Sequence, residues 1–581
     1  MFVQPRRHGS TVERFHTLID ALNAAPGDRL FVTAWIDEDE HEDVTFAEFC
    51  RRARIQAKLL FGHGVSAGDR VVILMPQGID AMTVFAGTMM LGGVPAILAY
   101  PNFKVEPSKY ASGLAGVTAN LAAKLVVIDE AFPDELLGHV AIGEGAKLLR
   151  AAHSNESDDL ELCPDEIHPD SLAFIQHSAG TTGLQKGVAL THRAALTQIG
   201  HLAEALQMDG GTDRIYSWLP LYHDMGLIAC FILPMVCHVS VVMQSPLDWV
   251  MHPDTLLQVI SDYRCTLAWM PNFAFQFVPR RTPRSRWSQY NLSSMRALIN
   301  CSEPVRASSM DEFQRAFSAV GLRPGALHSS YAMAENVFAV TQSVITGPDG
   351  PQRVRADGQR FRSEHTIVPI ADGLPGAIEF VSSGRLLPNH RVRIVSDTGE
   401  LLPDGRVGEI FVASDCLFRG YYNRPDLSAE VLRDGWYRTG DLGFQRDGEL
   451  YVVGRKKDLL ICGGENFYPQ DIEEIVAAHP AIHDGRTVAM GIYNPGLGTE
   501  DIVVVGEVER EELLADAAEL EREIRGQVVA ALGVAVRTIF LKPPKWIVKS
   551  TAGKPSRAGT REKLLREHPE LNLESQEKSF P

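Results

Sequence analysis

The sequence predicts an α/β fold in which a large N-terminal part is followed by a small β-subdomain and a smaller α+β unit. Apolar, β-rich runs alternate with helical patterns through most of the 581 residues, which is typical of βαβ units and parallel sheets. After about residue 389 short strands separated by turns take over, and a helix-and-strand pattern follows residue 457. A chain of this length has room for several domain-sized cores.

The expected parallel strands are short apolar runs bounded by turn residues or by helical patterns. They lie at 69–75, 123–128, 171–175, 240–243, 266–270 and 297–300. A helix over 81–91 follows the first of them, as the crossover between parallel strands requires. The N-terminal part is therefore expected to contain parallel sheets that are covered on both faces.

Two smaller units are expected after the parallel sheets. The β-subdomain covers about residues 389–455, where the N-terminal domain 1–455 ends, and a C-terminal α+β domain covers residues 456–581. The strands of the β-subdomain are expected at 390–395, 408–412 and 449–453. The C-terminal helices are expected at 471–479 and 512–526, and a strand at 501–507.

A nearly continuous apolar run, 225–243, is about long enough to span a bilayer. Pro234 and His238 interrupt the run, and Asp224 precedes it directly. A buried helix followed by a buried strand explains the run better, because strands of covered parallel sheets are continuously apolar. We therefore expect no membrane span.

Charge and cysteine content exclude several classes of protein. The chain has 56 Lys and Arg against 73 Asp and Glu, a formal net charge of −17, which argues against nucleic-acid binding. Its eight cysteines form no C-x-x-C pair, so we expect reduced thiols and a cytoplasmic location instead of a disulfide framework or a zinc site. The N-terminal residues lack the apolar stretch of a secretory signal.

The most informative segment is 177–187, HSAGTTGLQKG, which follows an apolar run. Its glycines allow successive backbone N–H groups to form an anion-binding concavity. Ser178, Thr181 and Thr182 add hydroxyl donors, and Lys186 adds a positive charge. The segment therefore predicts a polyphosphate site, although it does not fit the pattern G-x-x-x-x-G-K-[ST]. A flexible polar loop without a ligand is the alternative that composition alone leaves open.

A competing motif, GVSAG at 64–68, fits the G-x-S-x-G pattern of hydrolase nucleophiles. That pattern requires a strand before the serine and a helix after it. Here the helical pattern at 46–61 comes first and the strand at 70–75 follows. We therefore reject a serine hydrolase.

Four motifs together resemble those of the adenylate-forming superfamily of acyl-CoA synthetases, adenylation domains and luciferases. They are the Gly/Ser/Thr loop at 178–187, YRTGD at 437–441, GRKKD at 454–458 and KSTAGK at 549–554. The motifs stand in the same order as in the superfamily, and the likeness covers essentially the whole chain.

Within the superfamily the chain most resembles fatty acyl-AMP ligases. The shared segments are LPLYHDMGL at 219–227, PNFA at 271–274, EPVR at 303–306 and YPQDIE at 468–473. A polar Gly/Pro-rich stretch, 347–370, resembles the insertion that distinguishes those ligases from CoA synthetases. The resemblance implies an N-terminal domain of two parallel-type α/β subdomains plus the β-subdomain, and a small mobile C-terminal domain that rotates about Asp458.

The resemblance also implies the nucleotide-binding residues. Those for the ATP phosphates are Ser178, Gly180, Thr181, Thr182, Gly183 and Lys186. The adenosine contacts are Tyr331, which stacks on the adenine, Asp441, which accepts from both ribose hydroxyls, and Arg455. Glu335 holds Mg²⁺, and Lys554 is the catalytic lysine that bridges the α-phosphate and the substrate carboxylate.

An acyl pocket is expected beside the catalytic lysine. Its residues are His223, Trp269, Phe273, Phe275, Phe277, Cys301 and Ala332. His223 is expected to contact the substrate and not to act as a general base, because a carboxylate is already ionised at neutral pH. For each aromatic residue taken singly, a plain place in the core is an equally good interpretation.

Three features differ from the acyl-AMP ligase pattern. Ala332 and Cys301 stand where those ligases have glycine, and their larger side chains favour a shorter or unusual acyl chain. The segment 462–466, CGGEN, matches CoA synthetases instead. The second acceptor is therefore open between the phosphopantetheine of an acyl carrier protein, which we favour, and free CoA.

The sequence thus predicts a ligase that uses ATP and Mg²⁺ to convert a carboxylic acid, expected to be fatty, to acyl-AMP. The acyl group then passes to an acyl carrier protein or to a carrier domain of a polyketide or nonribosomal synthase, with CoA as the alternative acceptor. A nucleotide-binding regulator without turnover is a second hypothesis. The joint presence of Lys554, Glu335 and Asp441 disfavours it.

Overall fold

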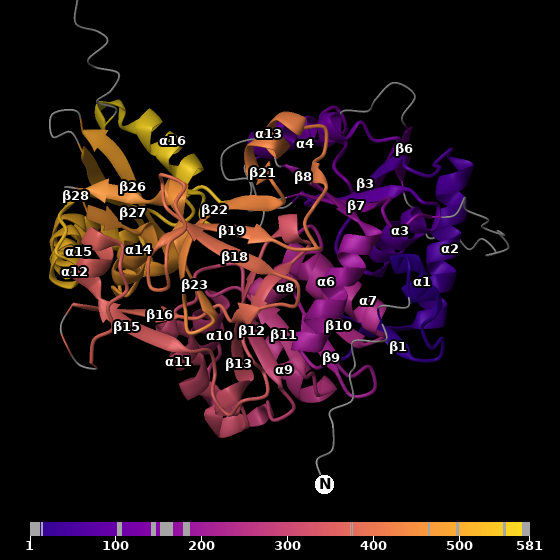
Figure 1. Ribbon diagram of the computed structural model, residues 1–581, viewed down its shortest axis with the longest axis horizontal. Helices are drawn as coiled ribbons and strands as arrows, with labels where there is room; N and C mark the ends of the chain where they lie inside the picture. The colour runs from indigo at the N-terminus through magenta and orange to yellow at the C-terminus, as the bar shows by residue number, and fades with distance from the viewer. Residues whose placement is uncertain are drawn as a thin grey trace, which may run out of the picture.

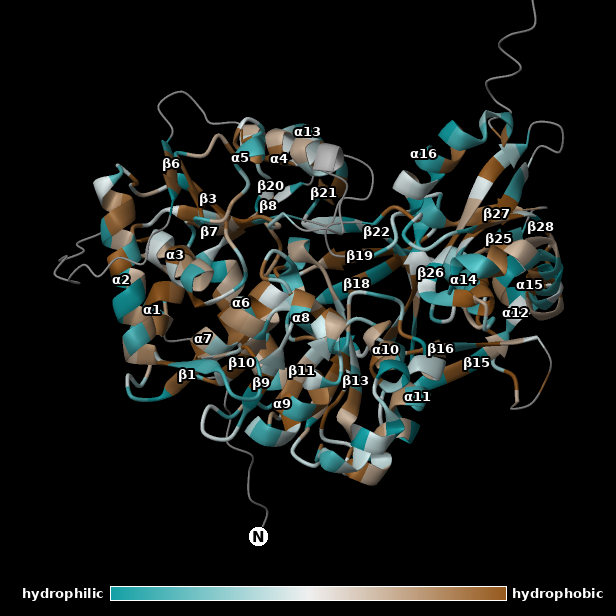
Figure 2. Ribbon diagram, turned by 180° about the vertical axis from the view of Figure 1, so that it is seen from behind, coloured by the Kyte–Doolittle hydropathy of each residue, from teal (hydrophilic) through white to brown (hydrophobic). Residues whose placement is uncertain are grey.

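A computed structural model of the chain shows a mixed α/β architecture, as the sequence predicts (Figure 1). The described residues are 12, 15–101, 107–140, 147–150, 167–177, 186–371, 374, 376–462, 465–494, 499–549 and 554–571. Helices carry apolar and polar residues on different faces, and the strands between them are largely apolar (Figure 2). The largest cluster of buried apolar side chains joins the N-terminal sheets to their helices.

The largest sheet has nine strands in the order β17-β14-β13-β12-β11-β9-β10-β1-β2. The pairings from β1 through to β13 are parallel, and β2, β14 and β17 close the two edges in antiparallel fashion. The strands are β1 (Leu30–Trp35), β2 (His41–Thr45), β9 (Arg214–Ser217), β10 (Ser240–Gln244), β11 (Leu267–Met270), β12 (Ala297–Asn300), β13 (Leu327–Ala332), β14 (Ala339–Gln342) and β17 (Arg385–Leu386). The strands predicted at 240–243, 266–270 and 297–300 are confirmed as β10, β11 and β12.

The N-terminal part also contains helices, most of which lie between strands of its sheets. They are α1 (Leu18–Asn23), α2 (Phe46–Gly62), α3 (Ile79–Met90), α4 (Pro107–Leu121), α5 (Asp134–Leu137), α6 (His192–Ala205), α8 (Pro246–Met251), α9 (Thr255–Tyr263), α10 (Ala274–Arg281) and α11 (Ala307–Phe317). Helices α2 and α3 pack closely, since a Cβ atom added at Gly87 would lie 2.6 Å from the carbonyl oxygen of Ala53. Helix α2 precedes the strand after Gly64, so the order that excludes a nucleophile elbow is confirmed.

A second sheet is parallel and has the order β4-β3-β5-β6. Its strands are β3 (Arg70–Leu74), β4 (Val94–Ile97), β5 (Leu125–Ile128) and β6 (Lys147–Arg150). The strand predicted at 171–175 is β7 (Leu172–His177), but it pairs antiparallel with β8 (Gly187–Thr191). Its apolar run reflects burial on both faces, which a sequence pattern cannot distinguish from parallel pairing.

The apolar run 225–243 lies inside the N-terminal part. It forms the π-helix η2 (Met225–Ile232), helix α7 (Leu233–Cys237) and strand β10, and every residue of η2 is buried. The predicted buried helix followed by a buried strand is therefore confirmed. Within the described part of the chain, no helix is long and apolar enough to cross a membrane.

A five-stranded sheet contains the strands predicted for the β-subdomain. It has the order β18-β19-β22-β21, and β23 pairs with β22. The strands are β18 (Arg391–Val395), β19 (Gly408–Ala413), β21 (Leu432–Arg433), β22 (Trp436–Arg446) and β23 (Glu449–Arg455), with α13 (Pro425–Val431) before β21. The ladder between β22 and β23 sets Asp441 opposite Arg455.

The Gly/Pro-rich stretch 347–370 belongs to a separate hairpin, made of β15 (Arg353–Asp357), α12 (Gly358–Glu364) and β16 (Ala377–Val381). Its Phe361 ring stacks on Tyr468 at 5.4 Å between centroids. His365, which follows α12, is hydrogen-bonded to Asn466. The hairpin thereby connects the N-terminal part to the start of the C-terminal unit.

The C-terminal unit has its own apolar cluster beside the sheet β26-β27-β28. Its elements are β24 (Leu460–Cys462), β25 (Glu465–Phe467), α14 (Pro469–Ala477), β26 (Ile482–Asn494), β27 (Thr499–Val508), η8 (Glu511–Asp516), α15 (Ala517–Leu532), β28 (Val536–Lys542) and α16 (Arg557–Glu567). The helix predicted at 512–526 begins later and ends later than expected. Its buried face continues through Ile524 and Val528, and the helix stops at Gly533, whose φ is +71°.

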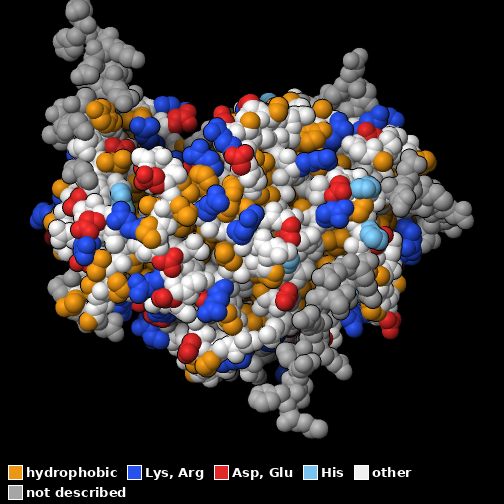
Figure 3. All heavy atoms as spheres, viewed as in Figure 1, with side chains coloured by type: hydrophobic (Ala, Val, Ile, Leu, Met, Phe, Trp, Pro, Cys, Tyr) orange, Lys and Arg blue, Asp and Glu red, His pale blue; other side chains and the backbone are white. Residues whose placement is uncertain are grey.

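Charged side chains of both signs are interspersed over the face seen in Figure 3. Many form exposed pairs, such as Arg193 with Asp170 at 2.6 Å. Exposed pairs of this kind contribute little because water screens them, so the apolar clusters carry most of the stability.

Candidate active site

A cleft of about 2710 Å³ is lined by both the N-terminal part and the C-terminal unit. It brings together most of the predicted site residues, which the sequence separates by hundreds of positions. Those that line it are Lys186, His223, Phe273, Phe277, Tyr331, Ala332, Glu335, Asp441, Arg455, Asp458 and Lys554. The predicted phosphate-binding residues Ser178, Gly180, Thr181, Thr182 and Gly183 lie outside the described residues.

In the cleft, Asp441 contacts a tyrosine hydroxyl and an arginine. The hydroxyl of Tyr331 donates to its Oδ2 at 2.6 Å, and Nε of Arg455 lies 3.2 Å from its Oδ1. Burial and the charge of Asp441 raise the pKa of Tyr331 well above its usual value, so the phenol stays protonated and donates. The charge of Asp441 likewise raises the pKa of Arg455. These three side chains form one group, which is held by a hydrogen bond and an ion pair.

A second charged group surrounds Glu335, which lies in the short helix η6 (Ala334–Asn336) and is 9% exposed. Tyr421 donates from its hydroxyl to Oε1 of Glu335 at 2.8 Å, and Nζ of Lys186 lies 4.6 Å from the centre of the Tyr421 ring. A single buried carboxylate fits Mg²⁺, which proteins commonly hold by one or two carboxylates plus substrate phosphates. The sequence analysis missed Tyr421, because only the tertiary fold brings this tyrosine against Glu335.

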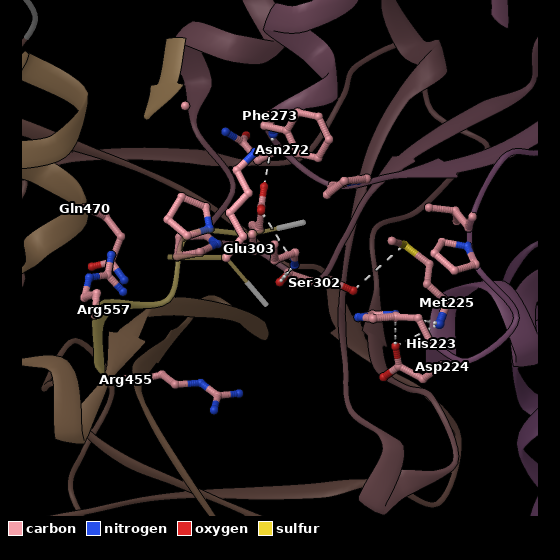
Figure 4. A pocket seen from close by; sticks show the side chains of 18 of the residues that line it. His223, Asp224, Met225, Asn272, Phe273, Ser302, Glu303, Arg455, Gln470 and Arg557 are labelled. Carbon is pink, nitrogen blue, oxygen red and sulfur yellow. Dashed lines mark hydrogen bonds and ion pairs between the residues drawn. The ribbon is translucent and has the colours of Figure 1, made fainter. Parts of the chain in front are cut away.

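Lys554 reaches into the cleft from the C-terminal unit. Its Nζ donates to the carbonyl oxygen of Ser302 at 3.0 Å and lies 3.6 Å from Oε1 of Glu303. The other oxygen of Glu303 accepts from the backbone N–H of Phe273 at 3.0 Å, as Figure 4 shows. Lys554 is therefore positioned by the EPVR segment at the point where an acid substrate and the α-phosphate are expected to meet.

His223 and Asp224 form a pair near the same point (Figure 4). Nδ1 of His223 lies 2.7 Å from Oδ1 of Asp224, which also accepts from the N–H of Met225 at 2.8 Å at the start of η2. Burial raises the pKa of Asp224, but His223, the Met225 N–H and the charge of Lys554 outweigh burial and lower it. Asp224 therefore stays ionised near Lys554, the predicted catalytic lysine.

The residues predicted for the acyl pocket divide into two groups. His223, Phe273, Phe277 and Ala332 line the cleft. Trp269, Phe275 and Cys301 are fully buried and lie outside its lining, since their side chains pack into the core. Phe275, for example, packs on Phe313 at 5.4 Å.

Trp218 is a pocket residue that the sequence analysis missed. It lines the cleft and stacks on the buried Trp249, with 3.6 Å between ring centroids. Phe273 meets both indoles edge-on. The resulting aromatic wall lies next to Glu303 and Lys554, because the Phe273 N–H binds Glu303. No periodic signal in the sequence distinguishes Trp218 from an ordinary core residue.

The predicted hinge, Asp458, lies in the short helix η7 (Lys456–Asp458). Its Oδ2 is 3.3 Å from Nη1 of Arg557, which also pairs with Glu473 at 2.6 Å. Polar contacts join the two sides of the cleft at Arg306–Asp471 (2.8 Å), Ser308–Glu474 (2.7 Å) and Arg280–Asp484 (2.8 Å). Of the CGGEN segment at 462–466, the two glycines lie outside the described residues.

One cleft thus combines an arginine–carboxylate–tyrosine group with a lysine from the C-terminal unit, an arrangement that fits an adenylate-forming enzyme. The chain belongs to the AMP-binding enzyme family, whose pattern matches residues 20–422. It is a ligase of this family and uses ATP.

The similar proteins are named as acyl-activating ligases. The chain is 30% identical over 580 residues to the long-chain-fatty-acid–AMP ligase FadD32 of Mycolicibacterium smegmatis. The aligned region covers 90% of this chain and 89% of that protein. It is 31% identical to the medium-chain-fatty-acid–[acyl-carrier-protein] ligase JamA of Moorena producens, with 91% of each chain covered. A solved structure from work on fatty acyl-adenylate ligases of E. coli and L. pneumophila matches with a TM-score of 0.87 and 26% identity, over 96% of this chain and 99% of that chain.

Proposed function

We propose that this protein activates a fatty acid with ATP and Mg²⁺ to give acyl-AMP and pyrophosphate, and then loads the acyl group onto the phosphopantetheine of an acyl carrier protein. One observation carries the proposal. Lys554 of the C-terminal unit lies against Ser302 and Glu303 in the same cleft as the Tyr331–Asp441–Arg455 group.

The cleft supplies what acyl adenylation requires. The reaction is an attack of a carboxylate on the α-phosphate, so positioning and neutralisation of charge dominate catalysis. The Asp441 group would bind the ribose, Glu335 would hold Mg²⁺, which neutralises phosphate charge, and Lys186 would face the pyrophosphate. Lys554 would give up its contact with Glu303 and bind the substrate carboxylate and the α-phosphate. There water would screen its positive charge little. No general base is needed.

A fatty acid is favoured as substrate by the apolar part of the cleft. Trp218, Phe273 and Phe277 provide an apolar wall beside the site of activation. The names of FadD32 and JamA refer to long-chain and medium-chain fatty acids, respectively. Ala332 lines the cleft where acyl-AMP ligases have glycine, which favours an acyl chain at the shorter end of that range.

A carrier protein is favoured as acceptor by the similarity to JamA, whose name specifies an acyl carrier protein. The hairpin β15–α12–β16 also supports it, because it resembles the insertion of acyl-AMP ligases and packs on Tyr468. Rotation about Asp458 would carry the C-terminal domain 456–581 between the two half-reactions. That rotation must break Arg306–Asp471 and remove Lys554 from the cleft.

The proposal is tested with purified protein, ATP, Mg²⁺ and a panel of saturated acids of increasing length. Mass spectrometry should detect acyl-AMP with at least one acid. Adding CoA and a phosphopantetheinylated carrier protein in parallel should then give acyl-carrier protein in preference to acyl-CoA. Predominant acyl-CoA would establish the alternative acceptor. Absence of AMP and pyrophosphate with every acid would overturn the proposal in favour of a nucleotide-binding regulator.

A further inference from the structure

Tyr421 contacts two charged side chains that line the cleft, Glu335 and Lys186. Its hydroxyl donates to Oε1 of Glu335 at 2.8 Å, and Nζ of Lys186 lies over its ring at 4.6 Å from the centroid. The side chain is 5% exposed, so water competes little with either contact. One buried tyrosine thus touches an anion with its hydroxyl and a cation with its ring.

Backbone hydrogen bonds hold Tyr421 next to both partners. Strand β20 (Gly420–Tyr421) pairs with β8 and sets Tyr421 opposite Val188, two residues after Lys186. The N–H of Tyr421 donates to Oγ of Ser428 at 2.8 Å. On the other side, the N–H of Phe418 donates to the carbonyl oxygen of Glu335 at 2.8 Å. The position of Tyr421 next to Glu335 and Lys186 is therefore fixed by the backbone.

The tyrosine hydroxyl acts as a donor to one oxygen of the carboxylate. The Tyr421 hydroxyl supplies the hydrogen of this 2.8 Å contact, because an ionised carboxylate can only accept. Its hydroxyl also lies 3.4 Å from that of Tyr437. Within the described residues Oε2 of Glu335 has no hydrogen-bond donor, so the carboxylate is fixed at one oxygen and available at the other.

We infer that Tyr421 is a positioning residue that orients Glu335 for the metal ion through its hydroxyl and Lys186 for the pyrophosphate through its ring. The inference rests on the proposed function. Partners that orient a metal-binding side chain typically contribute 10- to 100-fold to metal affinity. A lysine over an aromatic face contributes a smaller, separate amount.

The hydroxyl is tested by Tyr421→Phe, which keeps the ring under Lys186. The probe is Mn²⁺, whose binding to the protein–ATP complex is followed by electron paramagnetic resonance of the free ion. We expect Mn²⁺ affinity to fall about tenfold. The affinity for ATP without metal should be unchanged. Tyr422→Phe is the matched control, because it removes the neighbouring hydroxyl, for which no contact with Glu335 is observed.

A double-mutant cycle tests whether the Tyr421 hydroxyl affects metal affinity by orienting Glu335. In a Glu335→Gln background, Tyr421→Phe should cause no further loss of Mn²⁺ affinity. The cycle uses only binding, so it remains informative if the protein activates no acid, an outcome that would instead overturn the proposed function. Unchanged Mn²⁺ affinity in Tyr421→Phe, or an equal loss in the Glu335→Gln background, overturns the role of the hydroxyl.

The ring is tested by comparing Tyr421→Leu with Tyr421→Phe. Removing the ring should raise the KM for pyrophosphate in ATP–pyrophosphate exchange about two- to fivefold beyond the Phe variant. Lys186→Met should abolish the difference between the two variants. Equal KM values for Tyr421→Leu and Tyr421→Phe, with both proteins showing native thermal unfolding, would overturn the role of the ring.

Discussion

The hydroxyl of Tyr331 donates a 2.6 Å hydrogen bond to Asp441, although 110 residues separate the two in the chain. Asp441 is 9% exposed, and its other oxygen faces Arg455 at 3.2 Å. A carboxylate held by two donors is preorganised to accept further hydrogen bonds from ribose hydroxyls. The expectation that Tyr331 stacks on adenine stays a prediction, but the tyrosine has this second role in addition.

We expect Tyr331→Phe to raise the KM for ATP about tenfold, because a hydrogen bond to a charged group is worth about 1.5–3 kcal/mol. The variant keeps the ring and loses only the orientation of Asp441. Its preference for ATP over 2′-deoxy-ATP should also shrink. Tyr451→Phe, in the adjacent strand β23, is the control, since Tyr451 does not line the cleft. An unchanged preference for the ribose in Tyr331→Phe would contradict the assignment.

We expect Lys554→Ala to reduce adenylation by about 10²-fold or more, the usual cost of removing one preorganised charge. ATP–pyrophosphate exchange measures this step. Lys542→Ala is the control, because Lys542 belongs to the same unit and pairs with Glu567 but does not itself line the cleft. Near-normal exchange in Lys554→Ala would remove the lysine from the mechanism.

The pair Arg306–Asp471 should matter for the position of the C-terminal unit. Arg306→Asp sets three acids together, since Glu474 lies 3.5 Å from the same guanidinium. We expect ATP–pyrophosphate exchange to fall several-fold, because like charges at this distance disfavour the arrangement that inserts Lys554. The charge swap Arg306→Asp with Asp471→Arg should restore exchange. Failure of the swap, with both proteins folded, would show that the pair does not control the arrangement.

Ala332 is expected to limit the length of the acyl chain. Ala332→Gly removes one methyl group from the lining of the cleft and should shift the preferred acid toward longer chains. One methylene in an apolar pocket is worth about 1–3 kcal/mol in discrimination. Competition between acids of different length, read by mass spectrometry of the acyl-AMP products, measures the shift. A wild-type profile that already peaks at long saturated acids would contradict this role.

His192 should make stability depend on pH. Burial lowers its pKa to about 4, and its Nδ1 accepts from the N–H of Leu18 at 3.3 Å. Between that value and the unfolded value near 6.5 only the unfolded chain binds the proton, so stability falls as pH drops from about 6.5 toward 4. Over this pH range His192 should lower the free energy of unfolding by on the order of 3 kcal/mol.

Denaturant unfolding at several pH values tests the role of His192. His192→Asn should flatten the loss of stability between pH 6.5 and 4, since Asn does not titrate. His168→Asn, at a largely exposed histidine, serves as the control. The same slope in wild type and His192→Asn would exclude His192 as a source of the dependence.

Much of the N-terminal fold could be predicted because its signals are local. Strands such as β10, β11 and β12 are short apolar runs, and the helix–strand alternation dictates parallel pairing. The expected parallel pairing of β7 was wrong, because a strand buried on both faces has the same apolar pattern in parallel and antiparallel sheets. Helix α15 continues past its predicted end, because its buried face includes Val528 and the helix stops only at Gly533.

The site residues likewise fall into those that local sequence motifs predict and those that only the tertiary structure reveals. The motifs by themselves predicted Tyr331, Glu335, Asp441, Arg455 and Lys554 as site residues, because each stands within a short segment that resembles a known family, and all five line the cleft. Only the tertiary structure decided which side chains surround them. Tyr421 meets Glu335 through the pairing of β20 with β8, Trp218 lines the cleft by stacking on Trp249, and Trp269 and Phe275 face the core instead. Contacts of this kind depend on strand pairing and packing between distant segments, and a single sequence carries no local signal for them.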